Sequence, residues 1–473
     1  MIDSLYGAAD WSAITPLVIV AVTALVVLLM DLLLGKRVGR YGAIILGSLG
    51  LILAGVVAAG GYGLHQTLFG GAFVLDGFTV LFEEVVIIGA LGSLVLFGAI
   101  GREDRVAGAT ALLLWSATGA MLLAGAGTLL TIFLGIELLS LALYCLCGLA
   151  PRATAREAAL KYLLLSSTAS GFLLYGMALL FGATGSVTLS AFAAPMLAAS
   201  PLFWAGIAFF FVGIAFKLSL VPFHTWAPDV FQGAPLPVTA FMSVVTKAGV
   251  LAVLARVAYS ALPPQAASAL LLPLWVVAGI SMVVGNVGML AQTDLKRLIG
   301  YSGVAQVGYI LVALAGTTAF GLRAAIYYLF AYTLMNLGAF AVAAVLSGDG
   351  EEGTQLAGYR GLGHRRPLLA AAMTFFLLAL AGLPPTAGFL GKILILSAGV
   401  ASGYLWLDAL LIIGTAISLY GYAKVIGAMY ARDEHRSPTT PRPVVPLAWA
   451  SIALCALALL LLTFHPFASS VLP

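Results

Sequence analysis

Charged residues are scarce in this sequence. Of its 473 residues only 22 are basic and 18 acidic, which makes 8% of the chain charged, whereas an average soluble domain has about 25%. Hydrophobic residues make up 62%. So few charges cannot cover a soluble protein of this length, and many apolar runs are long enough to cross a bilayer as helices. The composition therefore predicts a membrane protein that spans the bilayer many times.

Other absences exclude further classes of protein. The apolar runs do not alternate polar and apolar residues, which excludes a spanning β-barrel. The net charge of +4 comes from short loop clusters, so nucleic-acid binding is not favoured. Cys145, Cys147 and Cys455 lie within apolar runs and are expected to be buried side chains rather than disulfides or zinc ligands.

Motifs that bind cofactors are also missing. There is no Walker-type phosphate loop and no GxGxxG after a strand, and the five histidines lie in loops or near span ends, which does not favour haem ligation. We expect no nucleotide, haem, iron–sulfur cluster or metal in this chain. Residues 1–15 contain two aspartates and no basic residue, unlike a signal peptide, so the first apolar stretch is expected to be retained.

Charges, prolines and glycines divide the chain into about fourteen predicted spans. They cover residues 14–35, 41–62, 77–100, 106–126, 128–149, 157–182, 202–222, 237–260, 269–291, 297–317, 322–346, 367–398, 405–429 and 444–466. The stretches between them are short, so the sequence predicts no soluble catalytic domain.

Basic residues are divided unequally between the two sides of the membrane. The loops on one side of the predicted topology hold fifteen basic residues, whereas the loops on the other side hold only Arg323. Positive loops stay cytoplasmic, so with an even number of spans both termini are expected on the outer, periplasmic side of a bacterial inner membrane. The basic residues of the favoured loops are Lys36, Arg37, Arg40, Arg102, Arg105, Arg152, Arg156, Lys296, Arg297, Arg360, Arg365, Arg366, Arg432, Arg436 and Arg442.

Four charges lie near the middle of predicted spans. They are Glu137, Lys217, Lys247 and Lys392. Each costs roughly 2.5–3.5 kcal/mol at a helix centre, so all four are expected to face a polar interior or one another. One interpretation is ion pairing between helices, but three lysines to one carboxylate argue against it. The other is a proton relay: burial lowers the pKa of a lysine toward neutrality, and a nearby carboxylate that restores the charged form can act as an electrostatic gate.

Other charges have simpler interpretations. Glu157 and Lys161 are four residues apart and are expected to pair at a membrane interface. Four further charged residues lie near span ends, from which side chains can reach the surface: Asp31, Arg256, Asp408 and Lys424.

Glu83 and Glu84 lie deeper in a span. Adjacent helical residues point about 100° apart, so only one can face the bundle interior. We expect a contact with a neighbouring subunit there.

Two predicted spans are interrupted by proline. Pro222 follows the segment KLSLV, and GLPPTAGF places two prolines in the middle of the span 367–398. Free carbonyls in a bilayer are tolerated only where they line a cavity or are buried in protein. Ordinary proline kinks are one interpretation. However, each break falls in the fourth span of a set of five, and paired broken helices in an inverted repeat are typical of transporters.

Polar residues near these breaks could extend a relay. His224 lies just after the first break and is either a proton shuttle or an ordinary hydrogen-bonded polar residue. Five residues within the spans could order water between the lysines: Asn286, Gln306, Tyr309, Tyr332 and Asn336.

The predicted repeats divide the chain into four parts. These are 1–105 with three helices, 106–260 with the first repeat (helices 4–8), 261–430 with the second repeat (helices 9–13), and 431–473 with a cytoplasmic loop and the last helix.

Several stretches of the sequence are familiar. Between about residues 130 and 400 the chain resembles the antiporter-like proton-pumping subunits of respiratory complex I, NADH–quinone oxidoreductase, and within them the subunit N branch. The matching stretches are FLGIELLSLALYCLCGL, EAALKYLLLSSTASGFLLYG, FKLSLVPFHTWAPDVFQGAPLPVTAFMSVVTKAG, DLKRLIGYSGVAQVGYI and ALAGLPPTAGFLGK.

The resemblance implies roles for five residues on a proton path along the membrane midplane. It makes Glu137 the gating glutamate, Lys217 its partner, Lys247 the central lysine and Lys392 the lysine of the outward half-channel, with His224 after the broken helix. It also implies an all-α fold of fourteen helices with two inverted five-helix repeats. NADH oxidation and quinone reduction, with flavin, iron–sulfur clusters and quinone, are expected in partner subunits. The expected neighbours are another antiporter-like subunit and small membrane subunits.

Two alternatives remain open from the sequence. A subunit of a Mrp-type sodium/proton antiporter would share the broken helices and the lysines. A structural spacer would need the four internal charges only as ion pairs.

Overall fold

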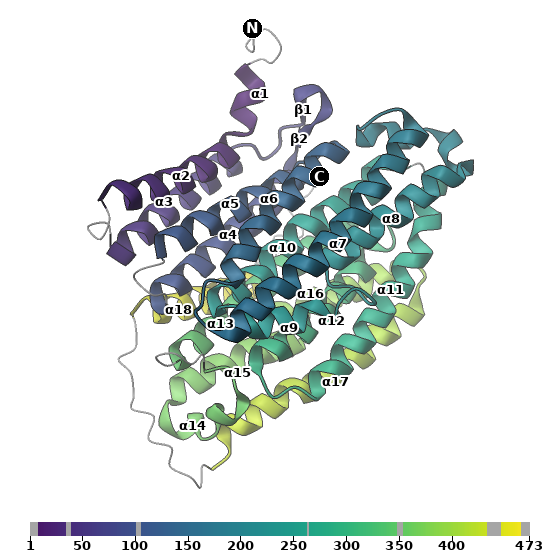
Figure 1. Ribbon diagram of the computed structural model, residues 1–473. Helices are drawn as coiled ribbons and strands as arrows, with labels where there is room; N and C mark the ends of the chain where they lie inside the picture. The colour runs from purple at the N-terminus through teal and green to yellow at the C-terminus, as the bar shows by residue number, and fades with distance from the viewer. Residues whose placement is uncertain are drawn as a thin grey trace.

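The computed structural model describes residues 8–34, 39–100, 106–262, 264–347, 353–432 and 446–464. In this part of the chain, twelve helices are long and apolar enough to cross a membrane, and they run alongside one another in one bundle (Figure 1). The predicted helical, multi-pass membrane architecture is confirmed. The twelve are α2 (Thr15–Leu34), α3 (Gly39–Ala59), α4 (Gly77–Ile100), α5 (Val106–Ala124), α6 (Leu129–Cys147), α7 (Ala153–Thr184), α10 (Leu236–Arg256), α11 (Pro264–Leu290), α12 (Leu295–Leu314), α13 (Ala319–Leu346), α17 (Leu405–Tyr430) and α18 (Pro446–Phe464).

Two further spans are broken where the prolines predicted. The first consists of α8 (Pro201–Lys217) and α9 (Trp226–Gly233), and the second of α15 (Pro367–Ala381) and α16 (Ala387–Ala401). Proline removes a backbone donor and clashes with the preceding turn, so neither helix continues through these segments.

Short elements connect the spans, among them one that the sequence analysis did not predict. Strands β1 (Gln66–Leu68) and β2 (Phe73–Leu75) form an antiparallel hairpin. Gly70 and Gly71 between them have φ of 64° and 95°, which glycine adopts at little cost. The pair of glycines between apolar residues was the available signal. The other short elements are α1 (Ala8–Ala13), η2 (Phe69–Gly71), η4 (Leu189–Ala193), η5 (Pro195–Ala199), η6 (Val257–Ala261), η7 (Leu356–Tyr359) and α14 (Leu362–Arg365).

Small residues set the closest helix contacts. A Cβ at Gly119 of α5 would lie 2.5 Å from the backbone nitrogen of Leu139 in α6, and one at Gly176 of α7 would lie 2.3 Å from that of Phe210 in α8. Membrane helices lack a hydrophobic driving force between them and depend on such close packing. These pairs of consecutive helices are therefore tightly joined.

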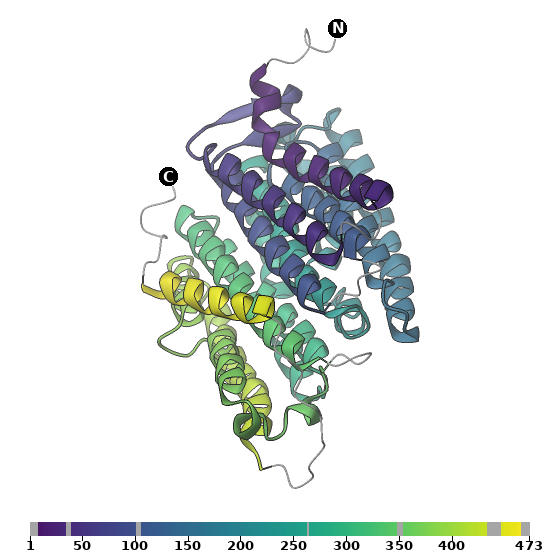
Figure 2. The same cartoon turned by 90° about the vertical axis from the view of Figure 1, so that its left-hand side faces the viewer.

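Helix α10 lies at the centre of the bundle. Every one of its residues is buried, and it packs against α4, α5 and α13. The last helix, α18, packs against α13 and against α4, which belongs to the first part of the chain (Figure 2). The lysine carried by α10 is consequently surrounded by protein on every side.

The end of α10 corrects one prediction. Arg256 does not reach the surface: it is 8% exposed and forms an ion pair of 3.1 Å with Asp76. It also donates hydrogen bonds to Thr79 Oγ1 and to the carbonyl of Ala124. Burial raises the pKa of Asp76, but the hydrogen bond and charge of Arg256 and the hydrogen bonds from Thr79 lower it below its ordinary value overall. The ion pair joins α10 to the start of α4 and the end of α5.

The prediction that Asp408 reaches the surface is also wrong. The aspartate lies in the first turn of α17 and is 4% exposed, so it is covered rather than extended to the surface.

A second polar cluster lies at the start of α7. Lys161 pairs with Glu157 at 2.7 Å, which confirms the predicted interfacial pair, and approaches Asp229 of α9 at 3.5 Å. Arg297 of α12 also pairs with Asp229. The cluster ties α7, α9 and α12 together beside the first broken helix. The basic residues Lys36, Arg37, Arg102, Arg105, Arg436 and Arg442 lie outside the described residues.

The two glutamates of α4 point apart, as expected. Glu83 is 1% exposed, whereas Glu84 is only partly buried and faces Gly55 of α3. A contact of either with a neighbouring subunit stays a prediction.

We predict that Arg256→Met lowers the free energy of unfolding by about 3 kcal/mol, because removing one partner of a buried pair leaves an uncompensated charge. Denaturation of the purified protein in mixed detergent micelles measures the change. Arg360→Met, at an exposed position, is the control and should change stability little.

The effect should depend on pH in one direction. Because the pKa of Asp76 is lower in the folded chain, the stability from the ion pair is fully present above the unfolded value of about 3.9. It is lost as pH falls through the lowered folded value, so variant and parent should converge in acid. A difference that grows in acid would contradict this interpretation.

Candidate functional site

Lys217 lies at the end of α8, at the first break, and is 3% exposed. Its Nζ donates hydrogen bonds of 2.5 Å to Ser140 Oγ of α6 and to Ser166 Oγ of α7. Tyr144 also donates to Ser166 at 2.6 Å. The ammonium group is therefore held by neutral hydroxyl groups.

Glu137 lies on α6, about one helical turn before Ser140, which accepts a hydrogen bond from this lysine. The Oγ of Ser170 donates to Glu137 Oε1 at 2.6 Å. Glu137 and Ser140 are three residues apart on α6, and Ser166 and Ser170 are four apart on α7, so each pair shares a helix face. The structure thus brings Glu137 and Lys217 to adjacent levels of the same two helices, with serines bound to both.

A row of aromatic rings begins at Lys217. Its Nζ lies 5.7 Å from the ring centre of Tyr162, which stacks on Trp226 at 4.8 Å. Trp226 in turn contacts Phe231 at 6.4 Å, and Lys247 Nζ lies 6.0 Å from the ring of Phe231. These contacts lead from the first lysine to the second through apolar rings.

At the break beside Lys217, the carbonyl of Phe216 accepts a hydrogen bond of 3.0 Å from the backbone of Ser219. Trp226, at the start of α9, donates its Nε1–H to the carbonyl of Phe216 at 2.8 Å. The same tryptophan therefore supplies part of the aromatic row and closes the end of α8.

Lys247 occupies the central position on α10 and is 2% exposed. Its Nζ donates to Tyr332 Oη of α13 at 3.1 Å. A Cβ at Gly303 of α12 would lie 2.2 Å from this nitrogen, so glycine leaves the space that the ammonium group needs. Lys247 points from the central helix toward the second half of the bundle.

Lys392 lies on α16, beyond the second break, and is 5% exposed. Its Nζ donates to the carbonyl of Ala381, the last residue of α15, at 2.9 Å and to Thr415 Oγ1 of α17 at 3.3 Å. It also lies 4.9 Å from the ring centre of Tyr309. The lysine thus satisfies a carbonyl that the broken helix leaves free.

Polar side chains fill the region between Lys247 and Lys392. Gln306 of α12 donates to the carbonyl of Leu380 at 3.3 Å and accepts a hydrogen bond from Tyr328. Ser302, one turn earlier on α12, is hydrogen-bonded to Tyr422 of α17. Hydroxyl and amide groups therefore continue from the central lysine toward the second break.

The residues named from the sequence as water-ordering are buried at this place. Asn286 donates to Tyr309 Oη at 2.8 Å and Asn336 to the carbonyl of Tyr332 at 3.1 Å. Three hydroxyl partners of the lysines were not predicted from the sequence: Ser140, Ser166 and Thr415. Ser140 could have been found, because it lies three residues after Glu137 in an otherwise apolar helix.

His224 is less closely connected than the lysines. It is half-buried, its ring lies 6.4 Å from that of Tyr301, and its Nδ1 is buried without a hydrogen-bond partner among the described residues. The hydrogen bonds of the described residues do not join it to Lys217 or Lys247. It is placed at the first break, as expected, but outside the hydroxyl cluster.

The three buried lysines do not have the partners expected if they served as structural ion pairs. Within the described part of the chain, none of the three buried lysines forms an ion pair with a carboxylate. Over the same residues, no three His, Cys, Asp or Glu side chains gather as metal ligands would. The arrangement can hold and exchange protons at three separate amines, each beside hydroxyl or carbonyl oxygens.

Known proteins share this sequence and fold. Residues 126–418 match the family described as NADH:quinone oxidoreductase/Mrp antiporter, transmembrane. The chain is 41% identical to NADH-quinone oxidoreductase subunit N 1 of Symbiobacterium thermophilum, over 95% of this chain and 96% of that protein. It is 39% identical to subunit N of Chloroflexus aggregans, over 95% of each.

Solved structures agree with these relatives. A chain of respiratory complex I from Thermus thermophilus with bound aureothin superposes with a TM-score of 0.83 at 35% identity, covering 97% of this chain and 99% of that chain. A chain of the Mrp complex from Dietzia sp. shares the fold alone, with a TM-score of 0.82 at 20% identity and coverage of 96% and 94%. The chain therefore belongs to the NADH:quinone oxidoreductase/Mrp antiporter family of membrane proteins, and within it to the NADH-quinone oxidoreductase subunit N proteins.

Proposed function

We propose that this subunit moves protons across the membrane through a relay of Glu137, Lys217, His224, Lys247 and Lys392. The observation that carries the proposal is that three lysines are buried in separate parts of the bundle, where their hydrogen-bond partners among the described residues are neutral. Neutral oxygens accept hydrogen bonds from an ammonium group but do not fix its charge as a carboxylate would. Each lysine can then be protonated and deprotonated in turn.

Glu137 is the proposed gate. Its charge acts on Lys217 across the two serine pairs, and an opposite charge nearby favours the protonated lysine. When the charge of Glu137 is neutralised or moved, Lys217 releases its proton toward Lys247. The proton then passes toward Lys392 along the hydroxyl and amide groups around Tyr332, Ser302 and Gln306. His224 is proposed to shuttle protons at the first break.

The two breaks support the proposed internal symmetry. Residues 106–260 and 261–430 would be inverted five-helix repeats, helices 4–8 and 9–13, flanked by 1–105 and 431–473. In each repeat, a side chain satisfies a carbonyl of the broken helix: Trp226 in the first and Lys392 in the second. Broken helices that line an ion path are typical of inverted-repeat transporters.

We further propose the orientation and the partners. The distribution of basic residues supports termini on the outer side of a bacterial inner membrane. Glu137 is only half-buried and lies beside exposed leucines of α6, of which Leu134 is 59% exposed. This face supports packing against a neighbouring antiporter-like subunit, and small membrane subunits would cover others. NADH oxidation and quinone reduction, with flavin and iron–sulfur clusters, would belong to partner subunits.

Co-purification in mild detergent separates this proposal from the Mrp-type antiporter. Flavin- and iron–sulfur-containing partners are expected with the chain. Their consistent absence from an intact complex would favour the antiporter, whose solved relative has the same fold.

Neutral replacements test the gate. Lys217→Met and Glu137→Gln should each lower proton translocation by the assembled complex in vesicles by roughly tenfold or more, because a positioned proton-transfer group is typically worth 10²–10⁴-fold. Lys424→Met and Glu157→Gln make the same chemical changes at exposed positions and should have little effect. Normal pumping by an assembled Lys217 variant would refute the relay.

Lys247→Met distinguishes a relay from a structural spacer. A relay residue predicts normal amounts of assembled complex with proton-coupled quinone reduction lowered by roughly tenfold. Native gels and quinone reductase assays measure the two quantities. Poor assembly with normal turnover per complex would support the spacer instead.

The serine partners can be tested together. Ser140→Ala with Ser166→Ala removes the two hydroxyl acceptors of Lys217 and should lower pumping by roughly tenfold, since each lost hydrogen bond to a charged group is worth about 1.5–3 kcal/mol. Ser397→Ala, whose exposed hydroxyl only donates to the carbonyl of Ile393, is the control. Unchanged pumping would show that the hydroxyl groups do not support the lysine.

A further inference from the structure

A buried carboxyl group lies between Lys392 and one end of the bundle. Asp408 is 4% exposed, and neither of its side-chain oxygens has a hydrogen-bond partner among the described residues. An ionised carboxylate without donors is costly to bury. The proposed relay does not include this side chain, so the burial of a carboxyl group in α17 needs an explanation.

The register of α16 and α17 relates Asp408 to the relay. Lys392 contacts Thr415 at 3.3 Å, and Gly399 faces Asp408, because a Cβ at 399 would lie 2.1 Å from Asp408 Oδ1. Gly399 follows Lys392 by seven residues and Asp408 precedes Thr415 by seven. Seven residues make about two helical turns, so the Lys392–Thr415 and Gly399–Asp408 contacts lie on the same face of α16 and the same face of α17. The two contacts are about 10 Å apart along the helix axis.

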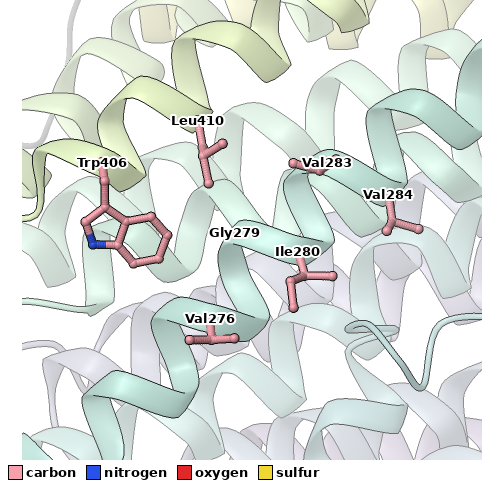
Figure 3. Close-up of a pocket in the computed structure, with 7 residues that line it drawn as sticks. All are labelled: Val276, Gly279, Ile280, Val283, Val284, Trp406 and Leu410. Atoms are coloured by element: carbon pink, nitrogen blue, oxygen red, sulfur yellow. The ribbon is translucent and has the colours of Figure 1, made fainter.

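The opposite face of α17 fixes this orientation. Trp406 and Leu410 are each two residues from Asp408 and therefore point about 200° away from it. They lie beside Gly279 of α11, where a Cβ would be 3.1 Å from Leu410 and 3.2 Å from Trp406, and with it line a shallow apolar groove (Figure 3). Asp408 is thereby directed toward α16 and not toward this groove.

Apolar side chains separate the lysine from the carboxyl group. Ile395 of α16 and Leu411 of α17 share the facing stripes with Lys392 and Asp408, and they are 0% and 3% exposed. The turn between α16 and α17, residues 402–404, lies just before Asp408 in the chain and contains no basic residue. By the distribution of basic residues, this turn lies on the outer side.

We propose that Asp408 accepts the proton that Lys392 releases and passes it to the water at the α16–α17 turn. The ammonium group of Lys392 gives one proton to water that enters between Ile395 and Leu411, and that water gives one proton to the carboxylate of Asp408. Lys392 becomes a neutral amine and Asp408 a neutral acid. The acid then releases its proton to the outer water, which restores the carboxylate.

This inference rests on the proposed function, and three variants of the whole complex in vesicles separate the two. Asp408→Asn keeps the shape of the side chain but cannot accept the proton, so proton translocation should fall by roughly tenfold or more. Asp31→Asn makes the same change at an exposed position of α2 and should pump as the parent does. Lys392→Met should abolish pumping if the relay itself is correct.

The outcomes are distinct. Loss of pumping in Lys392→Met with normal pumping in Asp408→Asn would overturn the role of Asp408 and leave the relay standing. Normal pumping in Lys392→Met would overturn both. If Asp408→Asn does not assemble, Gly399→Ala keeps the carboxyl group but displaces it, and pumping should again fall by roughly tenfold. Failure of both variants to assemble would also overturn the proposal, because the carboxyl group would then serve packing.

Discussion

The structure depends on one constraint: inside a bilayer, every backbone donor and acceptor must find a partner within the protein. Continuous helices meet it by themselves, but α8 and α15 end in the middle of their spans. At the second break, side chains of Gln306 and Lys392 donate to the carbonyls of Leu380 and Ala381. At the first, Trp226 adds a side-chain donor to the carbonyl of Phe216, which also accepts from the backbone of Ser219. The breaks and the buried polar groups consequently explain each other. At the second break, polar side chains help to satisfy the interrupted helix, and Lys392 finds there an acceptor for its buried ammonium group.

The same need for hydrogen-bond partners explains why lysine side chains can be buried inside this bundle. An ammonium group has three donors and no acceptor, so it matches the carbonyls and hydroxyls that surround it. A permanent carboxylate partner would hold the charge in place, as it does for Arg256 with Asp76. The chain contains both arrangements. The buried arginine, paired with its acid, joins three helices at one end of the bundle, whereas the three lysines donate to neutral oxygens among the described residues.

Much of this could be predicted from the sequence because the signals were local. Apolar runs, prolines and isolated charges showed the spans, the two breaks and the four internal charges. The partners of those charges could not be predicted, because Ser166 and Thr415 meet their lysines across 51 and 23 residues of chain. Arg256 and Asp408 were misjudged for a related reason: distance from a span end indicates depth, but only packing decides whether a side chain is covered. The hairpin at 66–75 was too short to show a period.

The aromatic row between the first two lysines has an electrical consequence. Tyr162, Trp226 and Phe231 offer no continuous chain of donors and acceptors, so the proposed transfer of a proton from Lys217 to Lys247 would need water beside the rings. Apolar rings also screen charge poorly, and Coulomb interactions extend much farther through them than through water. A change of charge on Lys217 is therefore felt at Lys247 before any proton arrives there. Under the proposed relay, the row would therefore couple the two lysines electrostatically until the proton is transferred.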